Sequence, residues 1–271
     1  MFKTRLISGI VLVIIALVLI ITGGNVLLFS MAAISLIGMF ELYRVFGIHN
    51  KLLGIIGYIA AVVYYANLFK HFIHDPFVFL IPTMMLILAV YVFGFSKYHA
   101  NQVMAAFFGI FYVAVMISYV YQTRMLSLGS FLVWLIFLSS WGCDTCAYCT
   151  GKLCSKAFKT HKMAPVLSPN KTIEGAIGGV VGSVLLSLIY GNVMKNFVSI
   201  DNQVLYSMLL VAGAGALISM IGDLAASAIK RNYDVKDYGK LIPGHGGILD
   251  RFDSVFFTAP IIYYLSLYLI K

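Results

Sequence analysis

The segment that decides the fold is residues 203–228, QVLYSMLLVAGAGALISMIGDLAASA, in which Asp223 is the single charged residue. A transmembrane helix needs about 20 mostly apolar residues, so this segment is long enough to cross a bilayer. The whole chain shows the same bias, because hydrophobic residues make up 61% of its 271 residues and charged residues 11%. A soluble domain has about 45–50% apolar and about 25% charged residues. The composition therefore excludes an ordinary soluble enzyme, a disordered chain and a small secreted disulfide scaffold.

Apolar segments of this length recur along the chain. We predict an all-α, polytopic integral membrane protein with about nine transmembrane helices, at roughly 6–22, 26–46, 52–70, 77–95, 103–121, 130–150, 173–194, 203–228 and 253–270. Closely spaced glycines in the span 173–194 predict close packing against another helix. We expect residues 1–271 to form a single membrane domain. In it, residues 1–125 supply mainly scaffold helices and residues 126–271 carry the active site.

The distribution of positive charge predicts the orientation of these spans. With nine spans and a cytoplasmic N-terminus, 15 of the 19 Lys and Arg residues fall on the cytoplasmic side. Positive residues concentrate in cytoplasmic loops, so we expect the N-terminus inside the cell and the C-terminus outside. Basic loops also suit anionic lipid, which explains part of the net charge of +9. Ten cations are nevertheless concentrated in just two segments, 151–172 and 229–251.

Most of the acidic residues lie in or beside these two basic segments. Seven of the ten are Asp144, Glu174, Asp223, Asp234, Asp237, Asp250 and Asp253. Ionisable groups near a bilayer are costly and usually functional. Acids and bases gathered on one side of the membrane therefore indicate a site. Glu41 is an exception, because Arg44 one helical turn away is its expected structural partner.

The acidic residues of the last two spans have the spacing of a metal site. Asp223, Ser227, Lys230 and Arg231 share one helix face by their i, i+4, i+7 and i+8 spacing. Asp250 and Asp253 are also one turn apart, at the start of the span 253–270, and follow a glycine-rich turn that suits oxygen anions. An Asp223–Lys230 pair and helix capping are the structural alternatives. Converging carboxylates beside many cations favour a Mg²⁺ site that also holds phosphates.

The other polar segment contains a second candidate phosphate site. Ser168 or Thr172 can cap the helix that follows, Pro169 suits its first turn, and Lys171 adjoins its N-terminus. Capping alone would produce a similar sequence. Upstream, Asp144 and Tyr148 are one turn apart on the preceding span.

All four cysteines occur within a short stretch of this region. Their spacing partly resembles an iron–sulfur run, but it departs from that run at the fourth residue. We interpret them as small helix residues, kept reduced, rather than as metal ligands: Cys143, Cys146, Cys149 and Cys154.

The motifs in both polar segments resemble those of a known enzyme family. The second segment carries Ser227-Ala228-Ile229-Lys230-Arg231, Lys236-Asp237, Gly239, Ile242-Pro243, His245-Gly246-Gly247-Ile248 and Asp250-Arg251-Phe252-Asp253. This pattern resembles the signature of the phosphatidate cytidylyltransferases, also called CDP-diacylglycerol synthases. The segment Ser168–Gly175 is similar to the second marker of that family, and Asp144, Tyr148 and Gly151 fit as well.

The resemblance implies that a cytidylyl group is transferred from CTP to phosphatidate, giving CDP-diacylglycerol and pyrophosphate. It implies an all-helical fold, dependence on Mg²⁺ with or without a second cation, and a homodimer. We expect an enzyme of the cytoplasmic membrane, embedded in the lipid bilayer, with its active site facing the cytoplasm and no nucleic-acid partner.

Residue roles follow from the resemblance combined with the charge pattern. The candidate metal ligands are Asp223, Asp250, Asp253, Asp144 and Glu174. The candidate catalytic residues are Lys230, Arg231, Lys236, Asp237, His245, Arg251 and Ser227. The lysines and arginines among them are expected to hold phosphates, and His245 and Ser227 to orient oxygens. The candidate nucleotide-binding residues are Ser168, Asn170, Lys171, Lys240 and Tyr148.

Three other functions compete with this one. The first is a CTP-dependent enzyme that acts on another lipid, such as a polyprenol or an ether lipid. The second is an ion-coupled transporter in which Asp223 is the coupling acid, although its carboxylates would then be spread along a pathway. The third is a membrane redox protein built on the cysteines.

Overall fold

The computed structural model describes residues 2–73, 75, 77–198 and 201–270, and helices dominate these residues. Seven of the described helices are long and apolar enough to cross a membrane, and two shorter apolar helices cover Ile7–Thr22 and Val78–Phe93. Each predicted span falls on one of these helices, so the predicted all-α, polytopic membrane fold is confirmed. The number of helices that cross the bilayer and the side on which the N-terminus lies stay predictions.

The chain forms two compact units. The first comprises Met1–Tyr121 with Tyr233–Arg251, and the second comprises Gln122–Asn232 with Phe252–Lys271. Each unit therefore contains a late part of the sequence as well as an early one. The single membrane domain expected from the sequence stays a prediction.

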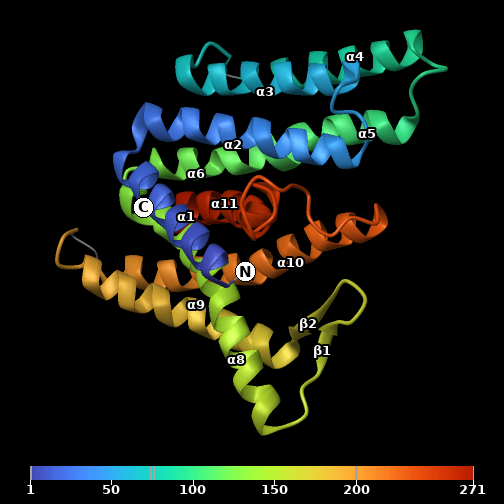
Figure 1. Ribbon diagram of the computed structural model, residues 1–271. Coiled ribbons are helices and arrows are strands. Elements are labelled where there is room, and N and C mark those ends of the chain that lie inside the picture. Colours follow the sequence, from blue (N-terminus) through green and yellow to red (C-terminus); the bar gives the residue numbers. More distant parts are fainter. Residues whose placement is uncertain (1, 74, 76, 199–200, 271) are drawn as a thin grey trace. The chain divides into compact units, whose positions relative to one another are not determined.

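The first unit consists of helices joined by short turns (Figure 1). Its helices are α1 (Phe2–Thr22), α2 (Gly24–Val45), α3 (Leu52–Lys70), α4 (Phe77–Phe93), α5 (Ala100–Gly109) and most of α6 (Met116–Arg124). A π-helical segment, Ile110–Val115, joins α5 to α6. The break between α1 and α2 falls at Gly23 and Gly24, which have φ angles of 59° and 50°. Glycine adopts such left-handed angles without steric cost, so the chain can turn there.

Tyr43 of α2 is one of the largest fully buried side chains of the first unit. Its hydroxyl donates a hydrogen bond to the Ala106 carbonyl at 2.5 Å. Gly57 and Gly109 lie against the Tyr43 ring, where an added Cβ at either position would clash with it. A polar group inside a membrane must find a partner within the protein, and glycines on neighbouring helices make room for this one.

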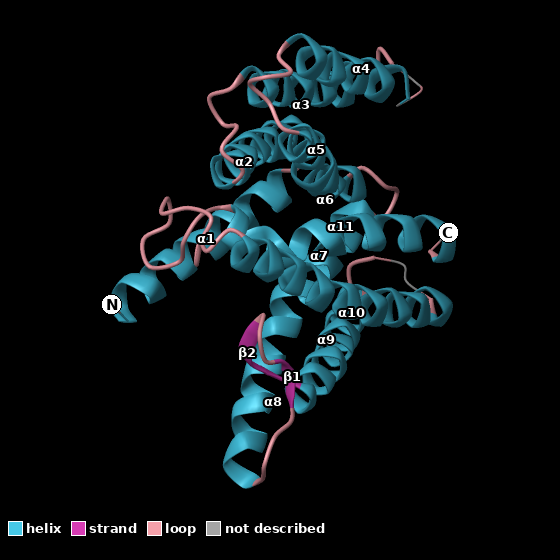
Figure 2. Cartoon of the chain, turned by 90° about the vertical axis from the view of Figure 1, so that its right-hand side faces the viewer, coloured by secondary structure: helices cyan, strands magenta, loops and turns pink. Residues whose placement is uncertain are grey.

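The second unit carries the remaining elements, which Figure 2 shows as helices and a single short hairpin. They are α7 (Gly129–Phe137), a π-helical segment (Leu138–Gly142), α8 (Cys143–Ala157), β1 (Lys162–Ala164), β2 (Ser168–Thr172), α9 (Ile173–Met194), α10 (Asn202–Asn232) and α11 (Leu249–Leu269). The division between the units falls in the first turn of α11, after Arg251.

The antiparallel hairpin of β1 and β2 is a feature that the sequence did not predict. Lys162 pairs with Thr172, and Ala164 pairs with Ser168. Thr172 also caps α9, because its Oγ1 accepts a hydrogen bond from the Gly175 amide at 3.1 Å. This confirms one of the two capping alternatives. The expected place of Pro169 in the first turn of the helix was wrong, because this residue lies in β2.

Helices α8 and α9 pack closely through small residues. A Cβ added at Gly179 would lie 3.0 Å from Cys143 Sγ, and one at Gly182 would lie 2.5 Å from Cys146 Sγ. The predicted role of the α9 glycines in helix packing is thereby confirmed. This packing fixes α8, the helix that carries Asp144, against the start of α9.

Candidate active site

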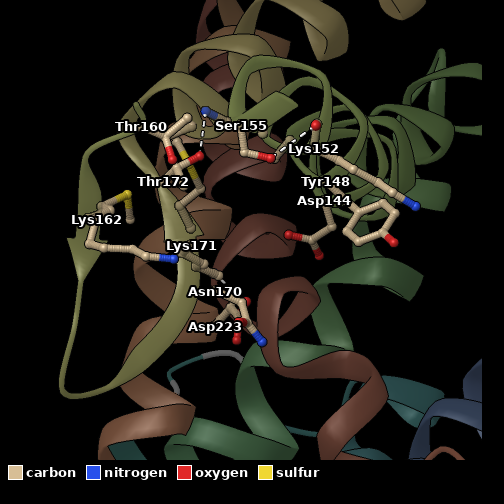
Figure 3. A pocket seen from close by; sticks show the side chains of 16 residues that line it. Asp144, Tyr148, Lys152, Ser155, Thr160, Lys162, Asn170, Lys171, Thr172 and Asp223 are labelled. Atoms are coloured by element: carbon tan, nitrogen blue, oxygen red, sulfur yellow. Dashed lines mark hydrogen bonds and ion pairs between the residues drawn. The ribbon is translucent and has the colours of Figure 1, made fainter. Parts of the chain in front are cut away.

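A cavity of about 610 Å³ lies in the second unit, among α8, the hairpin and α10 (Figure 3). Its charged lining residues are two aspartates and three lysines: Asp144, Asp223, Lys152, Lys162 and Lys171. Tyr148, Asn170 and Thr172 add polar groups to the wall. Of the residues predicted to bind metal or nucleotide, Asp144, Asp223, Tyr148, Asn170 and Lys171 therefore line a common cavity.

An ion pair between Lys171 on β2 and Asp223 on α10 joins two walls of this cavity. Both side chains are about three-quarters buried, with exposed fractions of 24% and 23%. Ser227, one turn further along α10, donates a weak hydrogen bond of 3.5 Å to Asp223 Oδ1. Asp223, for which Lys230 was the structural partner considered from the sequence, is thus paired with a lysine of the hairpin. Lys171 was predicted to bind an anionic phosphate, and in the structure the anionic group beside it is the Asp223 carboxylate.

Asp253 brings a third carboxylate to this part of the second unit. It interacts electrostatically with Asp223 and Asp144, which repel it, and with Lys230, which attracts it. Asp253 Oδ1 also accepts a hydrogen bond from the Ser254 amide at 2.8 Å. Carboxylates held close together in a partly buried place favour a nearby cation.

The oxygen ligands of this region suit Mg²⁺. Among the described residues, no group of three or more His, Cys, Asp and Glu side chains is arranged to hold a metal ion. Mg²⁺ does not need such a group, because it is usually bound through one or two carboxylates together with waters and substrate phosphates. Asp144 and Asp223 supply two carboxylates to the same cavity, and the lysines beside them suit the phosphates. The residues present therefore fit a metal that arrives with a phosphorylated ligand.

Two predicted residues near the hairpin have other partners. Glu174 accepts hydrogen bonds from the His161 amide, and its Oε1 lies 2.7 Å from His161 Nδ1. It thereby fastens the segment before β1 to the start of α9. Ser168 pairs with Ala164 in the hairpin. Neither Glu174 nor Ser168 is among the residues that line the cavity.

The remaining predicted residues of the second unit lie in the last turn of α10. Lys230 and Arg231 are the last basic residues before that helix ends at Asn232. Cations are favourable at the C-terminal end of a helix, so this placement is also electrostatically stable.

The first unit contains the other predicted phosphate-binding residues, in the loop that precedes α11. Lys236, Asp237 and Lys240 are exposed there. His245 lies in a tight turn, and its Nδ1 is 2.7 Å from Ser8 Oγ of α1. Ser8 Oγ also donates to the Pro243 carbonyl at 3.1 Å, so α1 holds this turn in two places.

Asp250 lies at the end of the same loop, and its side chain is almost fully buried. Its Oδ2 accepts hydrogen bonds from the Tyr238 amide at 2.8 Å and the Gly247 amide at 3.0 Å. Arg251 follows it and is half-buried. Asp250 therefore links Tyr238 and Gly247, two separate positions of the loop before α11, through a single carboxylate oxygen.

The cysteines are distributed along one helix rather than gathered. All four lie on α8 and are free thiols, with Cys143 buried and Cys149 exposed. Cys143 Sγ lies 3.8 Å from the Ala216 carbonyl of α10. Cys143 and Cys146 therefore pack against neighbouring helices, and the interpretation of all four as small helix residues stays a prediction.

Sequence reasoning did not single out Ser8, and it treated Glu41 and Arg44 only as a pair, so it missed the support that all three give to the basic loop of the first unit. Ile248 could have indicated the role of Glu41. It is the apolar residue just before α11 and has no side-chain acceptor, so the helix needs a cap from another part of the chain. Glu41 fills that role, as described below, and Arg44 donates to the Tyr238 carbonyl at 2.6 Å.

Fold and cavity together define a class of protein: an integral membrane protein with a partly buried cavity lined by lysines and aspartates. Three lysines against two aspartates give the cavity a net positive charge, and the cavity is large enough for a small-molecule ligand.

Comparison with known proteins identifies the family within this class. The sequence matches the cytidylyltransferase family over residues 3–269. It is similar to the phosphatidate cytidylyltransferase of Staphylococcus saprophyticus, with 35% identity over 266 residues that cover 96% of this chain and 97% of the relative. The phosphatidate cytidylyltransferases of Staphylococcus epidermidis and Staphylococcus aureus are each 34% identical, with the same coverage. The chain belongs to the cytidylyltransferase family, and the resemblance drawn from its motifs is confirmed.

Proposed function

We propose that this protein transfers the cytidylyl group of CTP to phosphatidate, forming CDP-diacylglycerol and pyrophosphate. The observation that carries the proposal is the basic cavity in which Lys171 and Asp223 face each other. The names of the relatives at 34–35% identity over almost the whole chain support the choice of both substrates.

The main requirement of the reaction is to neutralise the negative charge of the two phosphate groups, and a general base is not needed. An oxygen of the lipid phosphate, already anionic, attacks the α-phosphorus of CTP. The new P–O bond forms as the bond from the α-phosphorus to the bridging oxygen of the β-phosphate breaks, and pyrophosphate leaves with the electron pair. Two anions must approach each other, so positive charge around the phosphates lowers the barrier.

The lysines of the cavity supply part of this charge. In our proposal, Lys171 leaves Asp223 to contact a phosphate of CTP, and Lys152 and Lys162 lie along the same wall. Tyr148 and Asn170 orient the nucleotide from α8 and β2. Lys230 and Arg231 in the second unit, and Lys236, Lys240 and Arg251 in the first, are further proposed phosphate ligands.

Mg²⁺ is the proposed cofactor, and when bound it neutralises charge on the triphosphate. Asp223 and Asp144 are its proposed ligands in the cavity, with Asp253 beside them. Asp223 becomes available for this role once Lys171 has moved to a phosphate. Asp250 stays a proposed ligand from the sequence, and its hydrogen bonds to two amides fix the direction of its carboxylate.

The proposed location is the cytoplasmic membrane, with the active site on the cytoplasmic face. The 15 Lys and Arg residues assigned to that face support this orientation. CTP is a soluble cytoplasmic nucleotide and phosphatidate is a membrane lipid, so an enzyme at this interface reaches both substrates. A homodimer is the proposed assembly.

The direct test measures lipid products by mass after the purified protein is incubated with phosphatidate, CTP and Mg²⁺. We expect a CDP-lipid that forms with CTP but not with ATP, GTP or added EDTA. Polyprenol and an ether-lipid phosphate are offered in parallel. Product from one of these acceptors but not from phosphatidate would replace the proposed lipid substrate. The absence of any cytidylylated product from folded protein would refute the proposed reaction.

A further inference from the structure

Glu41 of α2 is a buried acidic residue to which the proposed chemistry assigns no role. Its side chain is 4% exposed. Oε1 accepts a hydrogen bond from the Ile248 amide at 3.1 Å, and Oε2 accepts one from the Leu249 amide at 2.9 Å. Both carboxylate oxygens are therefore directed at backbone amides where α11 begins.

These contacts make Glu41 the cap of α11. The first amides of a helix have no partner within the helix, and a side-chain acceptor just before the helix usually satisfies them. Ile248, which occupies that place, has no acceptor. Glu41 supplies one from another helix, and the positive end of the α11 dipole stabilises its charge. An acidic residue is thus used where the local sequence lacks a cap.

Glu41 also determines the course of the loop before α11. Gly239 and Gly247 both face its carboxylate so closely that an added Cβ at either glycine would clash with it. The Gly247 amide in turn donates to Asp250 Oδ2. The loop 238–248 therefore folds around the Glu41 side chain, and Asp250 links its beginning at Tyr238 to its end at Gly247.

A second contact from α2 acts on the same loop. Arg44, one turn after Glu41, donates from Nη2 to the Tyr238 carbonyl at 2.6 Å. The Tyr238 amide donates to Asp250. The end of α2 thus holds the loop at Tyr238 through Arg44 and at Ile248 through Glu41. Lys240 and His245 lie on the segment between these two points.

We infer that Glu41 is a positioning residue for nucleotide binding: by fastening the loop 238–248, it holds Lys240 and His245 where they bind phosphate groups of CTP. The inference rests on the proposed function, because that proposal makes Lys240 a phosphate ligand, and the inference adds His245 of the same loop. Glu41 itself is buried beneath the loop and touches backbone amides, so it acts through the loop alone.

The test replaces Glu41 by glutamine in the full-length protein. Glutamine keeps the size of the side chain but presents an NH₂ donor to one of the two amides. We expect CTP, titrated calorimetrically in the presence of Mg²⁺, to bind about tenfold more weakly, as on loss of roughly one hydrogen bond to a charged group. The binding stoichiometry stays that of the wild type. Hydrogen–deuterium exchange accelerates in peptides covering 238–249 and is unchanged elsewhere.

Two further variants make the test specific. Arg44→Gln removes the other contact to the loop from an exposed position, so the protein folds, and it weakens CTP binding in the same direction by about threefold. Asp201→Asn is the matched control, because Asp201 also accepts a backbone amide at the start of a helix, through Val204 at 2.7 Å. It should match the wild type in both measurements.

The outcomes separate positioning from simple stability. A lower stoichiometry with an unchanged CTP affinity would mean that Glu41 only maintains the folded fraction, and the inference would be wrong. Unchanged exchange at 238–249, or wild-type affinity in both α2 variants, would also overturn it. If Glu41→Gln fails to fold, the Arg44→Gln result decides. A wild-type protein that does not bind CTP would refute the proposed function itself, a result distinct from any of these.

Discussion

Replacing Lys171 by glutamine tests whether the cavity of the second unit binds CTP. Lys171 lies on β2, is 24% exposed and is paired with Asp223. A hydrogen bond to a charged group contributes about 1.5–3 kcal/mol. To reach a phosphate, Lys171 must first leave Asp223, and partly exposed ion pairs of this kind contribute about 0–1 kcal/mol. The midpoints of these two ranges differ by about 2 kcal/mol, so the expected net loss on substitution is roughly 20–30-fold in kcat/KM for CTP.

Lys162→Gln is the matched comparison, because Lys162 lines the same cavity from β1 but is exposed. An exposed lysine acts through a screened field, so we expect a loss of about threefold or less, which shrinks as salt is raised. The loss in Lys171→Gln should persist at high salt, because its contact is partly shielded from solvent.

The assay measures kcat/KM for CTP at saturating phosphatidate, at low and high ionic strength, for the wild type and both variants. Equal losses for the two lysines would contradict the reasoning, because the burial of Lys171 and its pairing with Asp223 would then have no consequence. A Lys171→Gln variant within twofold of the wild type would remove this residue from the phosphate site.

Three other predictions concern α8, α9 and α10. Asp223→Asn should lower turnover at least about 100-fold without shifting the thermal transition. Asp201→Asn, whose position is about 33 Å away along the helix axis, should be fully active. A folded Asp223→Asn variant with half the normal activity would exclude Asp223 as a metal ligand. Gly182→Ala should destabilise the protein by about 1–3 kcal/mol, because its Cβ would lie 2.5 Å from Cys146 Sγ. Gly213→Ala, with its nearest contact at 3.4 Å, should have little effect on the melting temperature. Replacing all four cysteines by serine should leave turnover above half of normal, and elemental analysis of the purified wild-type protein should detect no bound iron or zinc. The residues replaced are Cys143, Cys146, Cys149 and Cys154.

The helices could be predicted from the sequence because the bilayer imposes a length and a composition on each span. The predicted 52–70 and 173–194 coincide with α3 and α9. Other ends were less accurate, since α10 extends to Asn232 and α11 begins at Leu249, several residues beyond the predicted spans. Polar residues continue these helices past the apolar core, and hydropathy alone does not detect such extensions.

The hairpin was unpredictable for a different reason. The strand Ser168–Thr172 has no alternation of apolar and polar residues, and it exists because Lys162–Ala164 pairs with it. Its effect on the site is large, since it carries Lys171 to Asp223. The residue types of the cavity could therefore be predicted, but the pairing that brings them together could not.

The acidic residues show most clearly what residue type leaves undecided. Glu41 and Asp223 both lie in apolar helices near a basic segment. From the sequence, Arg44 was the expected partner of Glu41, whereas Asp223 was predicted to bind a metal ion, with a Lys230 pair as the structural alternative. In the structure, Arg44 attracts Glu41, but the hydrogen bonds of Glu41 come from two backbone amides, whereas Asp223 faces a lysine across a cavity. The difference depends on which element packs opposite each carboxylate. Backbone amides hold the Glu41 carboxylate in place. In the proposed reaction, Lys171 moves from Asp223 to a phosphate, and a metal ion then takes its place beside the Asp223 carboxylate.

Asp250 is both a carboxylate bound by backbone amides, like Glu41, and a proposed metal ligand, like Asp223. Its Oδ2 is held by the Tyr238 and Gly247 amides, and the residue is 5% exposed. Such hydrogen bonds do not argue against a metal, because carboxylates that bind metals are commonly oriented by hydrogen bonds from the surrounding protein. They make a distinct prediction for Asp250→Asn. If Asp250 only closes the loop, the variant should speed amide exchange at 238–249 and weaken CTP binding, as Glu41→Gln does. If Asp250 also binds Mg²⁺, the variant should in addition raise the Mg²⁺ concentration for half-maximal activity, and Glu41→Gln should not.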